Sequence, residues 1–349
     1  MSTAPGRFLP LATTLGAALI GGGVFSALGL PVAWLSGSMV FVAGLALAGV
    51  PLALPLPFRD LGFLLAGVAM GSTVTSEALG LIARYPFSVF GLLLSVVVSI
   101  VLATLLLQRS FGWDRPTAFL ASVPGALSAV MAVAAESSAD VRRVAMVQLM
   151  RLVVLVVVLP YAIGGMGKAA EVARTAMAGP WEFAALFAAA IALTEAFRRM
   201  NMANPMFLGA MLASTLLHVT EIIPGQVPDI IMLMGSLLVG AFCGHRFVGT
   251  TPAMILSTLA PSLAVLAIVL AVAAGCGVLV HWVTQLPLGA VLVAFAPGGL
   301  EAMVLMGAAL GLDTLYISTH HVLRAVGLML VMPLIAPRGE SAAPEVERS

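Results

Sequence analysis

Charge is what this sequence has least of. Only 9% of its 349 residues are Asp, Glu, Lys or Arg, the formal net charge is +1, and Lys168 is the single lysine. No basic run occurs, so a nucleic-acid-binding surface would have no electrostatic footprint. The chain is also too apolar for a soluble domain, because 61% of its residues are hydrophobic and its mean hydropathy is +1.13. We therefore expect a protein that crosses the lipid bilayer several times.

Cysteine and histidine are scarce as well. Cys243 and Cys276 both lie inside apolar segments, and they are too few and too far apart for a disulfide framework or a thiolate metal site. The five histidines have no spacing typical of a metal site. A phosphate-binding loop of the G-x-x-x-x-G-K-[ST] type is missing too, so ATP cannot drive the protein unaided. We expect no cofactor, no metal and no enzymatic activity.

Apolar segments separated by Pro, Gly or charge make up most of the chain. Their length and composition predict an all-α polytopic membrane protein with 10 to 12 transmembrane segments. The segments fall at about 8–28, 31–50, 60–81, 85–107, 116–136, 141–164, 180–197, 203–220, 228–248, 253–283, 287–311 and 314–336.

The two halves of the chain resemble each other. A shift of 173 positions places Pro124 on Pro297, Arg151 on Arg324 and "GFLLAGVAMG" from Gly62 on "GSLLVGAFCG". Shared hydrophobicity alone does not produce several Gly, Pro and Arg identities at one offset, so we predict an internal duplication. The predicted boundaries are a first membrane repeat at 8–164, a linker at 165–179, a second repeat at 180–336 and a disordered polar tail at 337–349.

The distribution of Lys and Arg bears on topology, because cytoplasmic loops are enriched in both. If all twelve segments cross the membrane, 8 of the 14 basic residues outside membrane interiors lie inside. If the two segments that contain Pro-Gly enter and leave on the same side, 11 of the 14 lie inside. Each half then crosses five times, which inverts the second repeat relative to the first. We expect this inverted arrangement, and a parallel six-plus-six duplication is the alternative.

A Pro-Gly pair interrupts one apolar segment in each half, in "SVPGALSAVM" from Ser122 and "FAPGGLEAMV" from Phe295. A helix break frees backbone groups that lipid cannot satisfy, so broken helices in membranes face protein or a watery cavity. In many secondary transporters such breaks meet near the bilayer midplane and form the solute site, with helix N-termini directed at anions. The alternative is that each Pro only bends its helix. The candidate binding residues at the breaks are Pro124, Gly125, Ser128, Pro297, Gly298, Gly299 and Glu301.

One arginine lies near the middle of each of two further apolar segments. Placing Arg151 or Arg324 at mid-membrane costs roughly 2.5 to 3.5 kcal/mol on insertion scales. Gln148 and His321 each lie three residues before one of these arginines and share its helix face. We predict that the arginines bind an anion and that Glu301 and His321 are candidate proton-coupling groups. The alternative is a buried pair of Arg324 with Glu301 that only holds the two repeats together.

Four stretches together resemble the AbrB membrane protein family, which is built from two copies of one membrane domain. They are "PVAWLSGSMV", the duplicated Pro-Gly phrase, "NPMFLGAML" and "HHVLRAVGLMLVMP", and the similarity extends from about residue 10 to 336. The family differs from the small DNA-binding regulators of the same name. Its members are often labelled ammonia monooxygenases or regulators of gene expression, and the resemblance implies no particular substrate.

These labels can be compared with the residues. A monooxygenase needs several His and carboxylate ligands around copper or iron, and only His320 and His321 share a segment. An ammonia channel would not favour two mid-membrane arginines, which repel ammonium. We expect a secondary transporter or exporter of a small, anionic solute in the bacterial inner membrane, with H⁺ or Na⁺ as coupling ion and lipid around it. The alternative is a membrane regulator that acts through transport or a partner. A homo-oligomer is compatible with the sequence.

Overall fold

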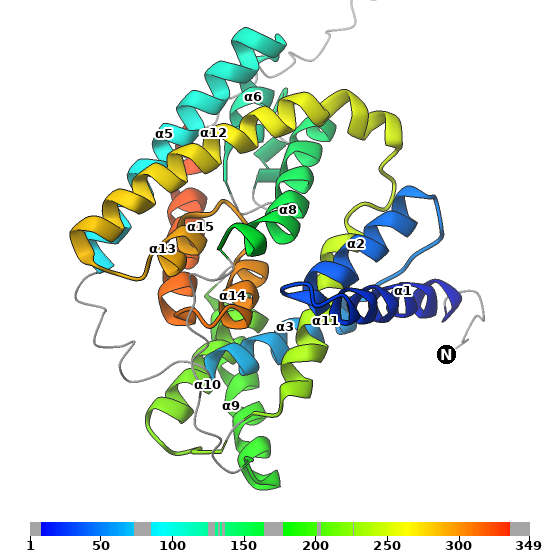
Figure 1. Ribbon diagram of the computed structural model, residues 1–349, viewed down its shortest axis with the longest axis vertical. Helices are drawn as coiled ribbons and strands as arrows, with labels where there is room; N and C mark the ends of the chain where they lie inside the picture. The colour runs from blue at the N-terminus through cyan, green and yellow to red at the C-terminus, as the bar shows by residue number, and fades with distance from the viewer. Residues whose placement is uncertain are drawn as a thin grey trace, which may run out of the picture.

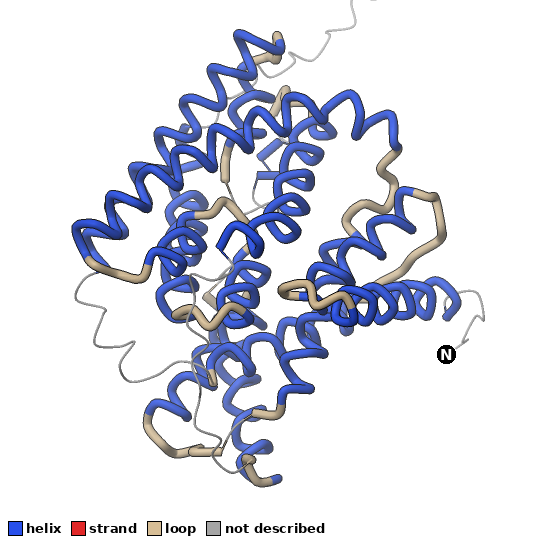
Figure 2. Tube along the Cα trace, in the orientation of Figure 1, coloured by secondary structure: helices blue, strands red, loops and turns tan. Residues whose placement is uncertain are grey.

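The structure is a computed structural model, and it describes residues 8–72, 85–124, 130–131, 133–134, 137–163, 177–200, 204–225 and 227–335. In these ranges the regular secondary structure is helical and contains no extended strand (Figure 2). Most of the predicted linker and the whole predicted tail, 337–349, lie outside the described residues.

The helices follow the apolar segments of the sequence, and Figure 1 shows their arrangement. The helices of the first half are α1 (Phe8–Ala27), α2 (Ala33–Leu47), α3 (Leu56–Gly71), α5 (Tyr85–Phe111), α6 (Arg115–Ser122) and α8 (Val141–Ile163). Those of the second half are α9 (Pro180–Arg199), α10 (Pro205–Val219), α11 (Asp229–His245), α12 (Pro252–Thr284), α13 (Leu288–Phe295), α14 (Leu300–Ala309) and α15 (Thr314–Ile335).

Five of the described helices, α1, α5, α8, α9 and α12, are long and apolar enough to cross a membrane. The longest of them, α5 and α12, pack side by side along one edge of the molecule (Figure 1). Their outward side chains are large and apolar, as Phe90 and Leu256 show with exposed fractions of 66% and 75%. Such faces would be unfavourable in water and are suited to lipid acyl chains. The prediction of an all-helical membrane protein is therefore confirmed.

Helix boundaries in the two halves recur at the offset found in the sequence. Helices α6 and α13 both begin and end 173 positions apart, and α8 and α15 begin 173 positions apart. Both interrupted segments end their first helix just before the Pro-Gly pair, since α6 ends at Ser122 and α13 at Phe295. Proline has no amide hydrogen and disfavours the helical conformation of the residue before it, which explains the break. The duplication itself, its inversion and the repeat boundaries stay predictions.

Paired glycines let helices of one half approach helices of the other half closely. In α3, Gly67 and Gly71 lie against the backbone of α10, and in α11, Gly240 and Gly244 lie against that of α2. A Cβ atom built on Gly240 would be 2.5 Å from the Leu35 carbonyl oxygen. Small residues four apart are typical of close helix contacts in membranes. The contacts α3–α10, α2–α11 and α3–α11 thus join the two halves, and α3 and α11 also pack against α14 of the second interrupted segment.

Candidate functional site

The first buried arginine caps the C-terminal end of a short interrupted helix. Arg151 lies on α8, ten residues after Val141, which places it about 15 Å along the helix at about 1.5 Å per residue. Its side chain is 3% exposed, and its Nη1 and Nη2 atoms donate to the Val123 carbonyl oxygen at 3.3 and 3.4 Å. Val123 follows the last residue of α6 and precedes the Pro-Gly pair.

Gln148 completes this network. Its Oε1 atom accepts a hydrogen bond of 2.8 Å from Arg151 Nη2. Its Nε2 atom donates to the carbonyl oxygens of Leu120 and Val123 at 3.4 and 3.3 Å. The last carbonyls of a helix have no partners within the helix, and a cation close to them is favoured by the helix dipole. Arg151 and Gln148 together satisfy this end of α6.

The second buried arginine makes the same arrangement with α13. Arg324 Nη1 donates to the Ala296 carbonyl oxygen at 2.8 Å, and Nη2 donates to that of Gly298 at 3.2 Å. His321 accepts from Arg324 Nη2 at its Nδ1 atom, 2.6 Å away, and donates from Nε2 to the Val293 carbonyl oxygen at 3.1 Å. Ala296 and Val293 lie 173 positions after Val123 and Leu120, the carbonyl partners in the first network. The two sites therefore share one geometry, with His321 in the place of Gln148.

In each half, the described part of the interrupted segment runs beside a long helix as far as the buried arginine of that helix. In the first half, the amide of Asp140, just before α8, donates to Thr117 Oγ1 near the start of α6 at 2.8 Å. The segment between Thr117 and Asp140 therefore begins and ends at the same level, and the break lies beside Arg151, deeper along α8. This geometry is the one expected of a segment that enters and leaves the membrane on the same side.

In the second half, the short helix before the break also runs parallel to the helix that carries the arginine. Val293 and Ala296 bond to His321 and Arg324 in the same order, so α13 runs parallel to α15. Helix α14 then returns antiparallel to α15, with Gly307 against Ile317, and a short turn joins the two helices.

No carboxylate pairs with Arg151 or Arg324 among the side chains that the structure describes. Among the described residues, the ion pairs involve other arginines, Arg59, Arg143, Arg198 and Arg199, which are much more exposed. The two buried guanidinium groups are also close enough for the charge of Arg151 to act on Arg324. Two like charges in a region of low dielectric constant repel each other strongly. The described part of the site therefore carries excess positive charge.

The other predicted site residues lie at the breaks. Pro124, Pro297 and Gly298 are buried, and Gly299 is the N-cap of α14. The Met303 side chain packs against Gly298, and a Cβ atom built there would lie 2.5 Å from Met303 Sδ, so a larger residue would require this side chain to move. Glu301 belongs to the first turn of α14, and its side chain is not among those described. Gly125 and Ser128 lie outside the described residues. The binding role of all these residues stays a prediction.

Four buried polar residues next to this site were not predicted as part of it. Tyr85 and Ser88 on α5 meet Tyr316 and His320 on α15. The sequence contains one signal for them, the position of His320 four residues before Arg324. It contains no signal that α5 packs against α15, since Ser88 and Tyr316 are 228 residues apart.

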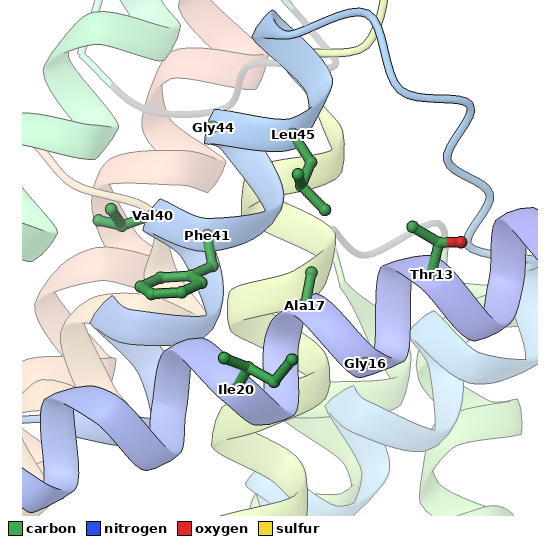
Figure 3. A pocket seen from close by; sticks show the side chains of 8 residues that line it. All are labelled: Thr13, Gly16, Ala17, Ile20, Val40, Phe41, Gly44 and Leu45. Carbon is green, nitrogen blue, oxygen red and sulfur yellow. The ribbon is translucent and has the colours of Figure 1, made fainter.

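Two surface hollows lie away from the arginines. An open groove of about 630 Å³ between α1 and α2 is lined by apolar or small residues around Ile20 and Phe41 (Figure 3). It offers an anion no charged partner and is suited to an acyl chain. A smaller pocket of about 230 Å³ lies at the start of α8 and contains Arg142 and Arg143. It borders the beginning of the first interrupted segment, where Trp113 packs under Arg143 at 5.4 Å. Among the described residues, no group of three or more His, Cys, Asp or Glu is placed to hold a metal ion.

The chain matches known proteins over most of its length. A family model described as "Transition state regulatory protein AbrB" matches residues 34–338. The uncharacterized protein YhjN of Bacillus subtilis (strain 168) is 24% identical over 345 residues, which cover 90% of this chain and 88% of that protein. The matched range includes both Pro-Gly breaks and both buried arginines. The resemblance predicted from the sequence motifs is confirmed, and the chain belongs to the AbrB family.

Proposed function

We propose that this protein is a secondary transporter that carries a small anionic solute across the inner (plasma) membrane of a bacterium. One observation carries the proposal: two arginines are buried at helix breaks, within range of each other's charge, with no carboxylate partner among the described side chains. A buried charge without a counter-charge is strongly unfavourable. A bound anion would supply that counter-charge and leave again when the site opens.

Backbone groups add to this site. Helix α14 begins at Leu300, two residues after Gly298, whose carbonyl Arg324 binds, and its N-cap is Gly299, which has no side chain to cap the first amides. The first amides of a helix and its dipole favour an anion at that position. The guanidinium of Arg324 and the start of α14 therefore offer two kinds of donor within one small region.

Exposed positive charge also lies at the start of α8, away from the buried arginines. The pocket there is lined by Arg142 and Arg143, and Asp140 within it pairs with Arg143 at 3.3 Å. Positive charge on the surface raises the local concentration of anions. Ammonium would be repelled both there and at the buried arginines, which argues against an ammonia channel. A regulatory role of the kind named in the family's description would, on this proposal, act through the transported solute.

A thermal-stability screen of the purified protein tests the proposal. The ligands are phosphate, sulfate, acetate and succinate, with ammonium and methylammonium as cationic controls. A ligand that binds only the folded protein stabilises it by about 2.7 kcal/mol at a hundredfold excess over Kd. We expect one anion to stabilise the wild type and to lose this effect in Arg324→Gln.

The control variant is Arg199→Gln, which removes an exposed arginine and should respond to the anion like the wild type. Stabilisation of Arg324→Gln to the same extent as the wild type, or stabilisation by the amines alone, would show that Arg324 only supports the fold.

A further inference from the structure

Four buried polar side chains form a cluster beside the second arginine network, which we call the α5–α15 cluster. Tyr85 and Ser88 come from α5, and Tyr316 and His320 come from α15. All four side chains are buried, and His320 and Ser88 have no exposed surface. Burying polar side chains is unfavourable unless they are hydrogen-bonded, so a cluster of buried polar side chains is a candidate for function.

The hydrogen bonds of the cluster fix which ring nitrogen of His320 carries the proton. Nδ1 lies 2.8 Å from the Tyr316 carbonyl oxygen, which can only accept, so Nδ1 carries hydrogen. Nε2 lies 2.9 Å from Ser88 Oγ. In a neutral ring Nε2 is then the acceptor, and the Ser88 hydroxyl donates to it. The Tyr316 hydroxyl, also bonded to Ser88, donates in turn to Ser88 Oγ. The chain of donors runs from Tyr316 through Ser88 to His320.

This arrangement can take up a proton without losing its hydrogen bonds. A proton added to Nε2 forms an N–H bond and makes the ring an imidazolium. Ser88 Oγ can then accept from Nε2, because a hydroxyl group both donates and accepts and rotates freely. Ser88 then donates to the Tyr316 hydroxyl oxygen, so both hydrogen bonds of Ser88 persist with their directions reversed.

His321 lacks this freedom. Its Nε2 donates to a carbonyl and its Nδ1 accepts from Arg324, so a second proton would face a guanidinium that cannot accept. In the first network Gln148 likewise donates to a carbonyl and accepts from the arginine, and its amide group cannot titrate. The role of His321 in the network therefore requires only a neutral donor and acceptor.

The groups that face His320 come from three helices. On α15 they are Tyr316, His321 and Arg324, and on α5 they are Tyr85 and Ser88. From α13 only the uncharged ring of Phe295 stacks on it, at 6.3 Å. The nearby cation is thus Arg324, four residues further along the same helix.

A carboxylate stands at the outer end of the cluster. Asp313, at the start of α15, acts electrostatically on both Tyr85 and Tyr316. Burial raises the pKa of Asp313 above its ordinary range, against hydrogen bonds from the Tyr316 and Leu315 amides that lower it. Asp313 is only partly buried, so its carboxylate is accessible to water.

We propose that His320 is the residue that binds the coupling proton, and that the anion and the proton are carried together. The proposal deepens and rests on the transport function above. The positive charge of Arg324 opposes a proton on His320, and an anion bound to Arg324 cancels that opposition. By linkage, each of the two solutes then favours binding of the other.

Nitrogen NMR of the full-length protein in lipid nanodiscs, labelled at its five histidines, tests the proposal. His320→Asn and His321→Gln identify the two signals. We expect His320 to show hydrogen on Nδ1 alone at high pH and on both nitrogens at low pH, while His321 keeps hydrogen on Nε2 alone. A neutral His320 at every pH at which the protein stays folded, or protonation of His321 in its place, overturns the proposal.

A second variant tests whether protonation of His320 depends on the hydrogen bonds of the α5–α15 cluster or only on packing. Ser88→Ala removes the hydroxyl bonded to Nε2 and should abolish the low-pH change at His320. Ser95→Ala is the matched control, because Ser95 is a buried serine on α5 that bonds only to the Leu92 carbonyl of its own helix. The proposal fails if Ser88→Ala titrates at His320 like the control.

The same titration with phosphate, sulfate, acetate or succinate at saturation tests the coupling. We expect the anion that stabilises the protein to increase the protonated fraction of His320 at a fixed pH. A decrease would mean exchange of anion against proton and would overturn joint transport. If none of the four anions stabilises the protein while His320 still titrates, the transport function loses its support, and His320 remains a proton-binding residue without a role in coupling.

Discussion

Arg151 and Arg324 each bond to the carbonyl after the short helix and to the side chain three positions earlier, although that side chain differs. Gln148 and His321 both donate to a carbonyl of the short helix and accept from the arginine. An amide and a neutral imidazole offer the same pair of functions at similar spacing. The arginine sites therefore require one donor and one acceptor at this position, and a titrating group is not required.

The equivalence predicts the effect of substitutions at position 321. His321→Gln should leave the free energy of unfolding and the anion stabilisation close to the wild-type values. His321→Leu leaves the Val293 carbonyl and a donor of Arg324 unpaired, and a buried unpaired group costs about 1–3 kcal/mol, more if it is charged. Thermal unfolding of the two variants measures the difference. The reciprocal variant Gln148→His should be tolerated too, and equal destabilisation by Gln and Leu at position 321 would contradict the equivalence.

At the scale of helices, the close contacts between the two halves depend on residues without side chains. Gly240 of α11 lies against the Leu35 carbonyl of α2, and Gly67 of α3 lies against that of Phe207 in α10. Two of the helices held by these contacts, α3 and α11, also pack against α14. Because the backbones touch, even one methyl group has no space to occupy.

Gly240→Ala should destabilise the protein by about 1–3 kcal/mol, the usual cost of overpacking a tight contact. Gly275→Ala on α12 is the control, because no atom lies within 4 Å of a Cβ built there. Thermal unfolding of both variants in the same detergent checks the prediction. Equal stability of the two variants would mean that the contact between α11 and α2 is looser than described.

Helix positions and helix breaks could be predicted from the sequence, and the packing between distant helices could not. Apolar runs and the Pro-Gly pairs locate α6, α13 and α14 because length, hydropathy and proline act locally. The hydrogen bond between Ser88 and Tyr316 joins residues that are 228 positions apart, and a single sequence contains no pattern that predicts such a contact. The arginines were predicted as binding residues, but their carbonyl partners became visible only when α6 and α13 were placed beside α8 and α15.

At the scale of the whole molecule, the topology depends on whether each interrupted segment returns to the side of the membrane from which it entered. The bond between Asp140 and Thr117 brings both ends of the first segment to one level, which is the geometry of five crossings in each half. With the second half inverted, Arg142, Arg143 and Arg246 lie on the inside together with most other basic residues.

Reporter fusions check this arrangement. Fusions after residue 112 and residue 140 should both report the inside, and a fusion after residue 172 should report the outside. The fusion after residue 112 serves as the internal reference, because both arrangements place it inside. A reporter outside after residue 140 and inside after residue 172 would replace the inverted arrangement with a parallel six-plus-six duplication.

The central claim, transport of a small anion through the two arginine sites, is tested most directly by uptake into proteoliposomes. The protein is reconstituted as the wild type, Arg151→Gln, Arg324→Gln and Arg199→Gln, and each is given the radiolabelled anion that stabilises the wild type. We predict saturable uptake by the wild type and Arg199→Gln and loss of at least tenfold, about 1.4 kcal/mol, in each buried-arginine variant. Uptake that survives in both buried-arginine variants, or that is absent from the wild type, would contradict the account.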